Sequence, residues 1–84
     1  MTRDMELIRK VLLAVENGQP NSPIEGYSDE QVKYHRELVI KAGFVEGSIL
    51  PDSETFSEIP DSVFLHKLTW TGHDFVDAIA SESN

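Results

Sequence analysis

Residues Leu68–Ile79 read LTWTGHDFVDAI, and this stretch predicts a turn from a strand into a helix. Thr71 and Asp74 have the spacing of a capping box, whose two side chains bind free backbone N–H groups at the start of a helix. Trp70 precedes this cap and Phe75 follows it by four residues, which is the spacing of a hydrophobic staple. We therefore expect Thr71 to cap the helix and Trp70 to be a packed, structural residue.

The segments before this corner predict a β-hairpin. Phe44–Leu50 and Val63–Thr69 are rich in β-branched and aromatic residues and are predicted to be its strands. The polar, acidic segment Pro51–Ser62 would be a long loop between them. A tight turn at Gly47–Ser48 is the alternative.

A second capping box predicts the central helix. Ser28 and Gln31 have the S-x-x-Q spacing, and Gly43 suits the left-handed conformation found just past a helix end. We therefore predict a helix over Asp29–Ala42. His35 lies on the apolar face of this helix, and we expect a buried, hydrogen-bonded side chain there rather than a ligand or a base.

The other predicted elements lie nearer the ends of the chain. Apolar residues at helical spacing predict a first helix over Asp4–Asn17. The last helix is predicted over Gly72–Ala80, followed by frayed residues 81–84. The connector between the first two helices is rich in Pro and Gly, and Pro23–Tyr27 within it is predicted to form at most a short strand.

Together these elements predict a single α+β domain over residues 1–84. The order is helix, short strand, helix, β-hairpin, helix, with three helices and a two- to three-stranded antiparallel sheet. This order suggests a small winged-helix-like domain. A DNA-reading winged helix inserts two helices joined by a tight turn before the wing, whereas Ser28–Gly43 has room for only one.

Three segments of the chain resemble a small bacterial and phage family described only as a domain of unknown function. They are MTRDMELIRKVLLAVE, GYSDEQVKYHRELVIKAGFVEG and LTWTGHDFVDAI, and they occur in the same order as in that family. The resemblance covers most of the chain. It implies a winged-helix-like fold and a prophage or mobile-element setting, and it implies no activity. Members of that family usually continue beyond the last helix, so we expect any contact made by such an extension to be missing.

The composition narrows the possible functions. The chain has 15 acidic and 7 basic residues among its 84, a formal net charge of −8, and should repel nucleic acids and anionic membranes at long range. It has no Cys, so it cannot form a disulfide or a thiolate metal site. The N-terminal residues do not have the pattern of a signal peptide. We expect a cytoplasmic protein without a cofactor.

Candidate catalytic residues are few. His73 and Asp74 form a pair that some metal-dependent phosphohydrolases use, but His35 and His66 lack metal-ligand spacing to it. The chain also lacks a G-x-S-x-G nucleophile elbow and a glycine-rich phosphate loop. We therefore expect that the protein is not an enzyme. A metal-dependent enzyme centred on His73 and Asp74 is kept as a third hypothesis, after the two that follow.

Two sets of residues are candidates for partner contact. Leu13 and Ile40 fall outside the apolar faces of their helices and could form a partner patch if they are close in space. Lys33, Arg36 and Lys41 lie on the central helix and are the candidate DNA contacts, although acidic residues begin that helix.

Our main hypothesis is a non-catalytic protein-interaction module that binds another protein or a second copy of itself. The alternative is a small winged-helix DNA-binding transcriptional regulator that acts as a dimer.

Overall fold

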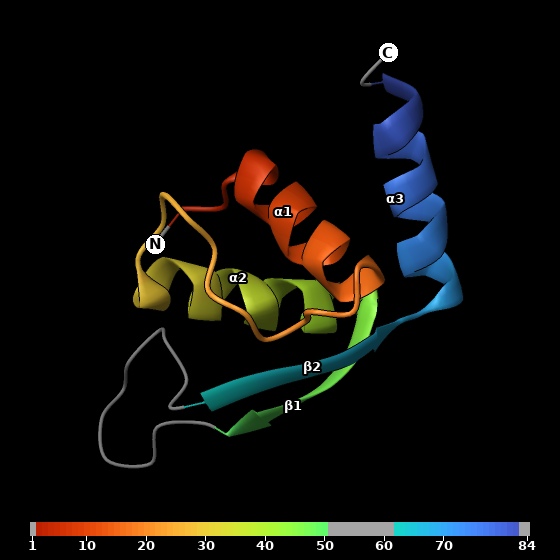
Figure 1. The fold of residues 1–84 in the computed structure, drawn as a ribbon. Helices are drawn as coiled ribbons and strands as arrows, with labels where there is room; N and C mark the ends of the chain where they lie inside the picture. Colours follow the sequence, from red (N-terminus) through yellow and green to blue (C-terminus); the bar gives the residue numbers. More distant parts are fainter. Residues whose placement is uncertain (1, 51–61, 83–84) are drawn as a thin grey trace.

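The computed structural model describes residues 2–50 and 62–82, and within these ranges it contains three helices and a two-stranded antiparallel sheet. In chain order the elements are α1 (Met5–Glu16), α2 (Asp29–Lys41), β1 (Val45–Leu50), β2 (Ser62–Leu68) and α3 (Trp70–Glu82). The helices α1 and α2 cover one face of the hairpin, and α3 runs beside α1 and extends past it (Figure 1). The predicted α+β class, the three helices and the hairpin are confirmed. The likeness to winged-helix domains stays a prediction.

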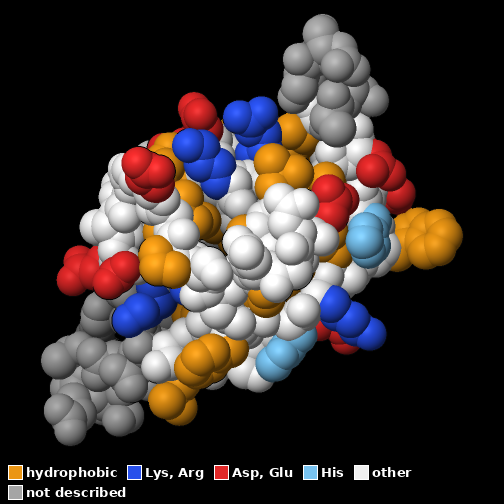
Figure 2. Space-filling view, viewed as in Figure 1, with side chains coloured by type: hydrophobic (Ala, Val, Ile, Leu, Met, Phe, Trp, Pro, Cys, Tyr) orange, Lys and Arg blue, Asp and Glu red, His pale blue; other side chains and the backbone are white. Residues whose placement is uncertain are grey.

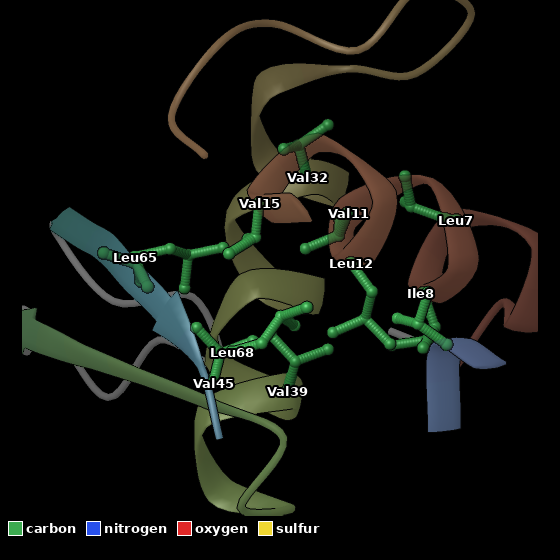
Figure 3. Close-up of a cluster of buried hydrophobic side chains, with 12 residues drawn as sticks. Leu7, Ile8, Val11, Leu12, Val15, Val32, Val39, Val45, Leu65 and Leu68 are labelled. Atoms are coloured by element: carbon green, nitrogen blue, oxygen red, sulfur yellow. The ribbon is translucent and has the colours of Figure 1, made fainter. Parts of the chain in front are cut away.

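The core lies where α1, α2 and the inner face of the hairpin meet (Figure 3). Helix α1 contributes five buried residues at helical spacing, and β2 contributes Val63, Leu65 and Leu68, as expected when one face of each element is covered. Burying one such side chain contributes roughly 1.5–3 kcal/mol. The buried apolar residues among those described are Leu7, Ile8, Val11, Leu12, Val15, Val32, Val39, Val45, Val63, Leu65, Leu68 and Val76.

The predicted capping box at the start of α2 is confirmed. Ser28 Oγ accepts a hydrogen bond from the Gln31 backbone N–H at 3.1 Å, and Gln31 Oε1 accepts one from the Ser28 N–H at 2.9 Å. Gly43 follows the helix with a φ of 82°, a conformation that a side chain would disfavour. The sequence therefore determined both ends of α2.

The prediction that Thr71 caps the last helix is wrong. Helix α3 begins at Trp70, and Thr69 Oγ1 accepts the hydrogen bond from the Gly72 N–H at 3.0 Å. A Cβ atom on Gly72 would overlap the Phe44 carbonyl oxygen, so the first turn of α3 packs directly on the backbone before β1. This contact between distant parts of the chain fixes where the helix starts.

The earlier start of α3 also contradicts the predicted staple between Trp70 and Phe75. The Trp70 side chain is 84% exposed, so it is not a packed, structural residue. Phe75 instead stacks on Phe44, with 4.5 Å between the ring centroids. The helix also continues to Glu82, two residues beyond the predicted end at Ala80, and residues 83 and 84 lie outside the described part.

The predicted short strand at Pro23–Tyr27 is wrong, because Pro23 and Ile24 have no regular structure and the next three residues form a turn and a bend. A side chain takes the place of a third strand. Asn21 Oδ1 accepts the Leu65 backbone N–H at 2.9 Å, and Asn21 Nδ2 donates to the Leu65 carbonyl oxygen at 3.2 Å. In the described part of the chain the sheet therefore has two strands, and Asn21 satisfies the outer edge of β2 at one residue.

The alternative tight turn at Gly47–Ser48 is also wrong, since both residues lie within β1. The strand pairing shifts between Glu46 and Gly47, and a Cβ on Gly47 would overlap the Phe64 carbonyl oxygen. The loop predicted at Pro51–Ser62 falls mostly on residues 51–61, which lie outside the described residues.

Candidate functional site: a groove between the helices

Two adjoining pockets lie between the start of α1, the end of α2 and α3. Their volumes are about 370 and 360 Å³, and both are lined by Met5 and Phe75, so they are parts of one groove. We call it the helix groove. Its apolar lining includes Met5, Ile8, Leu38, Phe44, Phe75, Ala78 and Ile79. Pockets of this volume with mostly apolar walls are typical of binding sites.

The floor of the helix groove is held by contacts of Phe44. Its backbone N–H donates to the Val39 carbonyl oxygen at 3.0 Å, and its carbonyl oxygen accepts the Thr69 N–H at 2.9 Å. Its ring stacks on Phe75. Since α2, the hairpin and α3 are all joined at this residue, the groove is formed without a partner.

His35 holds the start of α1, which forms one wall of the helix groove. The side chain is 2% exposed, and its Nε2 accepts the Asp4 backbone N–H at 2.8 Å. Its Nδ1 lies 2.7 Å from the Gln31 carbonyl oxygen, so Nδ1 carries the proton and the ring is neutral. The predicted buried, hydrogen-bonded histidine is therefore confirmed, and it positions the residues next to Asp4, including Met5.

The groove is more basic than the rest of the chain. Among the residues that the structure describes, three basic and one acidic residue line it, whereas the whole chain has 7 basic and 15 acidic residues. These charged residues are Arg3, Arg9, Lys41 and Glu6. Figure 2 shows Lys or Arg side chains beside hydrophobic ones where α1 begins. The pairs Arg9–Glu6 at 4.0 Å and Lys41–Glu37 at 3.9 Å are partly exposed, so a partner's charges can still interact with these cations.

The three candidate DNA contacts on α2 do not form one cluster. Lys33 and Arg36 line a pocket beside the connector, whereas Lys41 lines the helix groove. The Arg36 guanidinium donates to the Ser22 carbonyl oxygen at 2.8 Å. Burial lowers the pKa of Arg36 from its ordinary value, and the nearby Asp29 carboxylate opposes this shift. Arg36 therefore holds the connector to α2 and is poorly placed for phosphate contact.

Leu13 and Ile40 have different neighbours. Leu13 lies with Ile24 in a shallow pocket beside the connector, and Ile40 packs on Gly47 of the hairpin. Both side chains are partly buried and pack against the core. The large hydrophobic side chains that are exposed among the described residues are Met5, Leu50, Phe64 and Trp70.

Of these four residues, Met5 alone belongs to the helix groove. Sequence reasoning assigned no site role to Met5, Arg3 or Arg9, and it predicted for Phe75 only a staple contact with Trp70. No local signal indicates that the start of α1 lies open beside α3.

The residues of the metal hypothesis, His73 and Asp74, are both exposed at the start of α3. Across residues 2–50 and 62–82, no group of three or more His, Asp or Glu side chains is arranged to hold a metal ion. In the same part of the chain, no helix has the length and apolarity needed to cross a membrane.

Comparison with known proteins identifies relatives. The profile of a family described as "Hypothetical protein (DUF2513)" matches residues 2–84. An "Uncharacterized protein" of Haemophilus influenzae (strain Rd) is 31% identical over 90 residues, which cover 99% of this chain and 71% of the relative. No solved structure matches the chain.

Proposed function

Because the chain belongs to the DUF2513 family of hypothetical proteins, whose description names no activity, we propose its function from its own surface: it is a non-catalytic protein-interaction module that docks a partner in the helix groove. The observation that carries this proposal is the preformed apolar groove between α1, α2 and α3. We also propose that it acts in the cytoplasm, in keeping with its lack of Cys, and in the mobile-element setting that the family resemblance implies.

The groove has the features of a docking surface for a protein segment. Met5 is 48% exposed at its centre, although it is a large apolar side chain. Exposed apolar surface rimmed by charged residues is typical of interaction sites, because covering it removes apolar area from water. Among its described lining residues, the groove has one acidic residue, Glu6, which pairs with Arg9 and leaves no acid–base pair there for chemistry.

Site-specific photocrosslinking tests this proposal. A photoreactive amino acid in place of Met5, in cells that naturally carry the gene, should give a discrete covalent adduct with a protein. The matched control places the same amino acid at Glu16, an exposed residue at the other end of α1. An adduct at Met5 and none at Glu16 is the expected result.

Specificity for the groove is checked by a second substitution. Ala78 is exposed and lines the groove, so Ala78→Arg should obstruct docking and remove the adduct at Met5. Adducts of equal yield at Met5 and Glu16, or no adduct at either position, would show that the groove is not a docking surface.

A further inference from the structure

The wall of the helix groove that α3 provides is shaped for another helix. Phe75, Ala78 and Ile79 line it at positions i, i+3 and i+4, which are neighbours on one helical face. Such a stripe presents the ridges and grooves on which a second helix packs, and a small residue within it allows close approach. An extended peptide would instead need a free strand edge for its backbone, and the lining residues within 2–50 and 62–82 include none from β1 or β2.

The charged residues of the groove indicate which residues should lie beside the apolar stripe of such a helix. Arg3, Arg9 and Lys41 lie around the apolar lining of a chain whose net charge is −8. Outside the groove the predominantly acidic surface would repel an acidic segment, whereas these cations would attract it at close range. Charge complementarity therefore favours a partner with acidic residues on either side of its apolar stripe.

We infer that the helix groove binds an acidic amphipathic helix of a partner protein, with apolar residues at i, i+3, i+4 and i+7 and Glu or Asp beside them. This inference rests on the proposed interaction function and names the chemistry of the partner. The apolar stripe of the bound helix packs between α1 and α3. Its carboxylates lie near the three cations, where they fix its orientation.

Binding of designed helical peptides tests the inference. The first fluorescent peptide has about 14 residues, or four turns, with Leu and Ile at the stripe positions and Glu beside them. The second keeps the apolar residues and replaces each Glu with Lys. Fluorescence anisotropy should show that the Glu peptide binds the full chain at least about tenfold more tightly than the Lys peptide, and that the preference weakens as salt rises.

Two protein variants separate the groove from the overall charge. The double substitution Arg9→Glu and Lys41→Glu should reverse the preference between the peptides. The control, Lys10→Glu and Lys67→Glu, changes the net charge equally but lies outside the groove, and it should keep the preference. Ala78→Arg adds positive charge but obstructs the stripe, so it should weaken binding if a helix docks there. Tighter or unchanged binding would contradict helix docking.

Other results overturn the inference in distinguishable ways. If neither peptide binds, or both bind equally, while the Met5 crosslink persists, the partner has different chemistry and the interaction function stands. If the Met5 adduct is absent, the proposed function itself fails. If sedimentation velocity shows a dimer that Ala78→Arg abolishes, and the Glu peptide does not bind, the occupant of the groove is a second copy of this chain.

Discussion

At the scale of single residues, two threonines separated by one position have different roles. Thr69 Oγ1 accepts the Gly72 N–H at 3.0 Å, whereas Thr71 lies exposed within the first turn of α3. Loss of a cap costs about 0.5–2 kcal/mol. We therefore expect Thr69→Ala to lower the free energy of unfolding by this amount and Thr71→Ala to change it by less than about 0.5 kcal/mol. Urea denaturation measures both, and equal effects would contradict the assigned cap.

His35 provides a second prediction at this scale. His35→Leu removes the acceptor of the Asp4 N–H and leaves that donor unsatisfied in a part-buried site. An unsatisfied buried group costs about 1–3 kcal/mol, and we expect a loss of unfolding free energy in this range. The start of α1 should also be less well held, because the Asp4 N–H loses its acceptor. The amide of Asp4 should therefore exchange hydrogen faster than in the unaltered chain.

The tautomer of His35 provides an independent check. Long-range nitrogen–proton NMR correlations should show the proton on Nδ1, because Nε2 accepts the Asp4 N–H and Nδ1 faces the Gln31 carbonyl oxygen. A proton on Nε2 would contradict the hydrogen bond that positions Met5 in the groove wall.

Single residues also show why the site was only partly predictable from sequence. The burial of His35 followed from its place on an apolar helical face, which is a local pattern. The cap of α3 did not, because Thr69 and Thr71 both precede a helical sequence and the contact of Gly72 with Phe44 decides between them. Arg3, Arg9 and Lys41 are separated along the chain, so their shared position around the groove depends on tertiary packing.

At the scale of elements, a side chain from a loop binds the outer edge of β2. The Asn21 side chain binds the backbone of Leu65 on the outer edge of β2 through both its amide oxygen and its amide nitrogen. A lone asparagine in a loop has no sequence signature for this role. The sequence therefore predicted the hairpin, from its strand composition, whereas the short strand that it allowed at Pro23–Tyr27 is absent.

Asn21 can be tested through the exchange of one amide. Asn21→Ala removes the acceptor of the Leu65 N–H, so this amide should exchange at least about tenfold faster, since local opening then requires fewer hydrogen bonds to break. Pro23→Ala, in the same connector but outside this contact, is the matched control. Unchanged protection of Leu65 in Asn21→Ala would show that the side chain does not satisfy the strand edge.

At the scale of the whole molecule, the distribution of charge sets which partners the protein can bind. The net charge of −8 opposes the approach of nucleic acid, and the candidate contacts on α2 are divided between two pockets. Phosphate contact needs clustered Lys and Arg, which supply most of the non-specific affinity for DNA. Three cations do line the helix groove, but its other lining residues are mostly apolar, which suits a protein segment better than a phosphate backbone.

We therefore expect no measurable binding of random duplex DNA at about 150 mM salt, a condition in which exposed charges are screened beyond about 8 Å. Fluorescence anisotropy with a labelled duplex measures this directly. Dimerisation could join the Lys33 and Arg36 surfaces of two chains, so the titration should extend to protein concentrations at which sedimentation detects any dimer. Binding near micromolar that weakens steeply with salt, and that Lys33→Ala reduces, would contradict the expectation. Local clustering of cations would then outweigh the net charge, and the DNA-binding regulator would replace the interaction module as the better hypothesis.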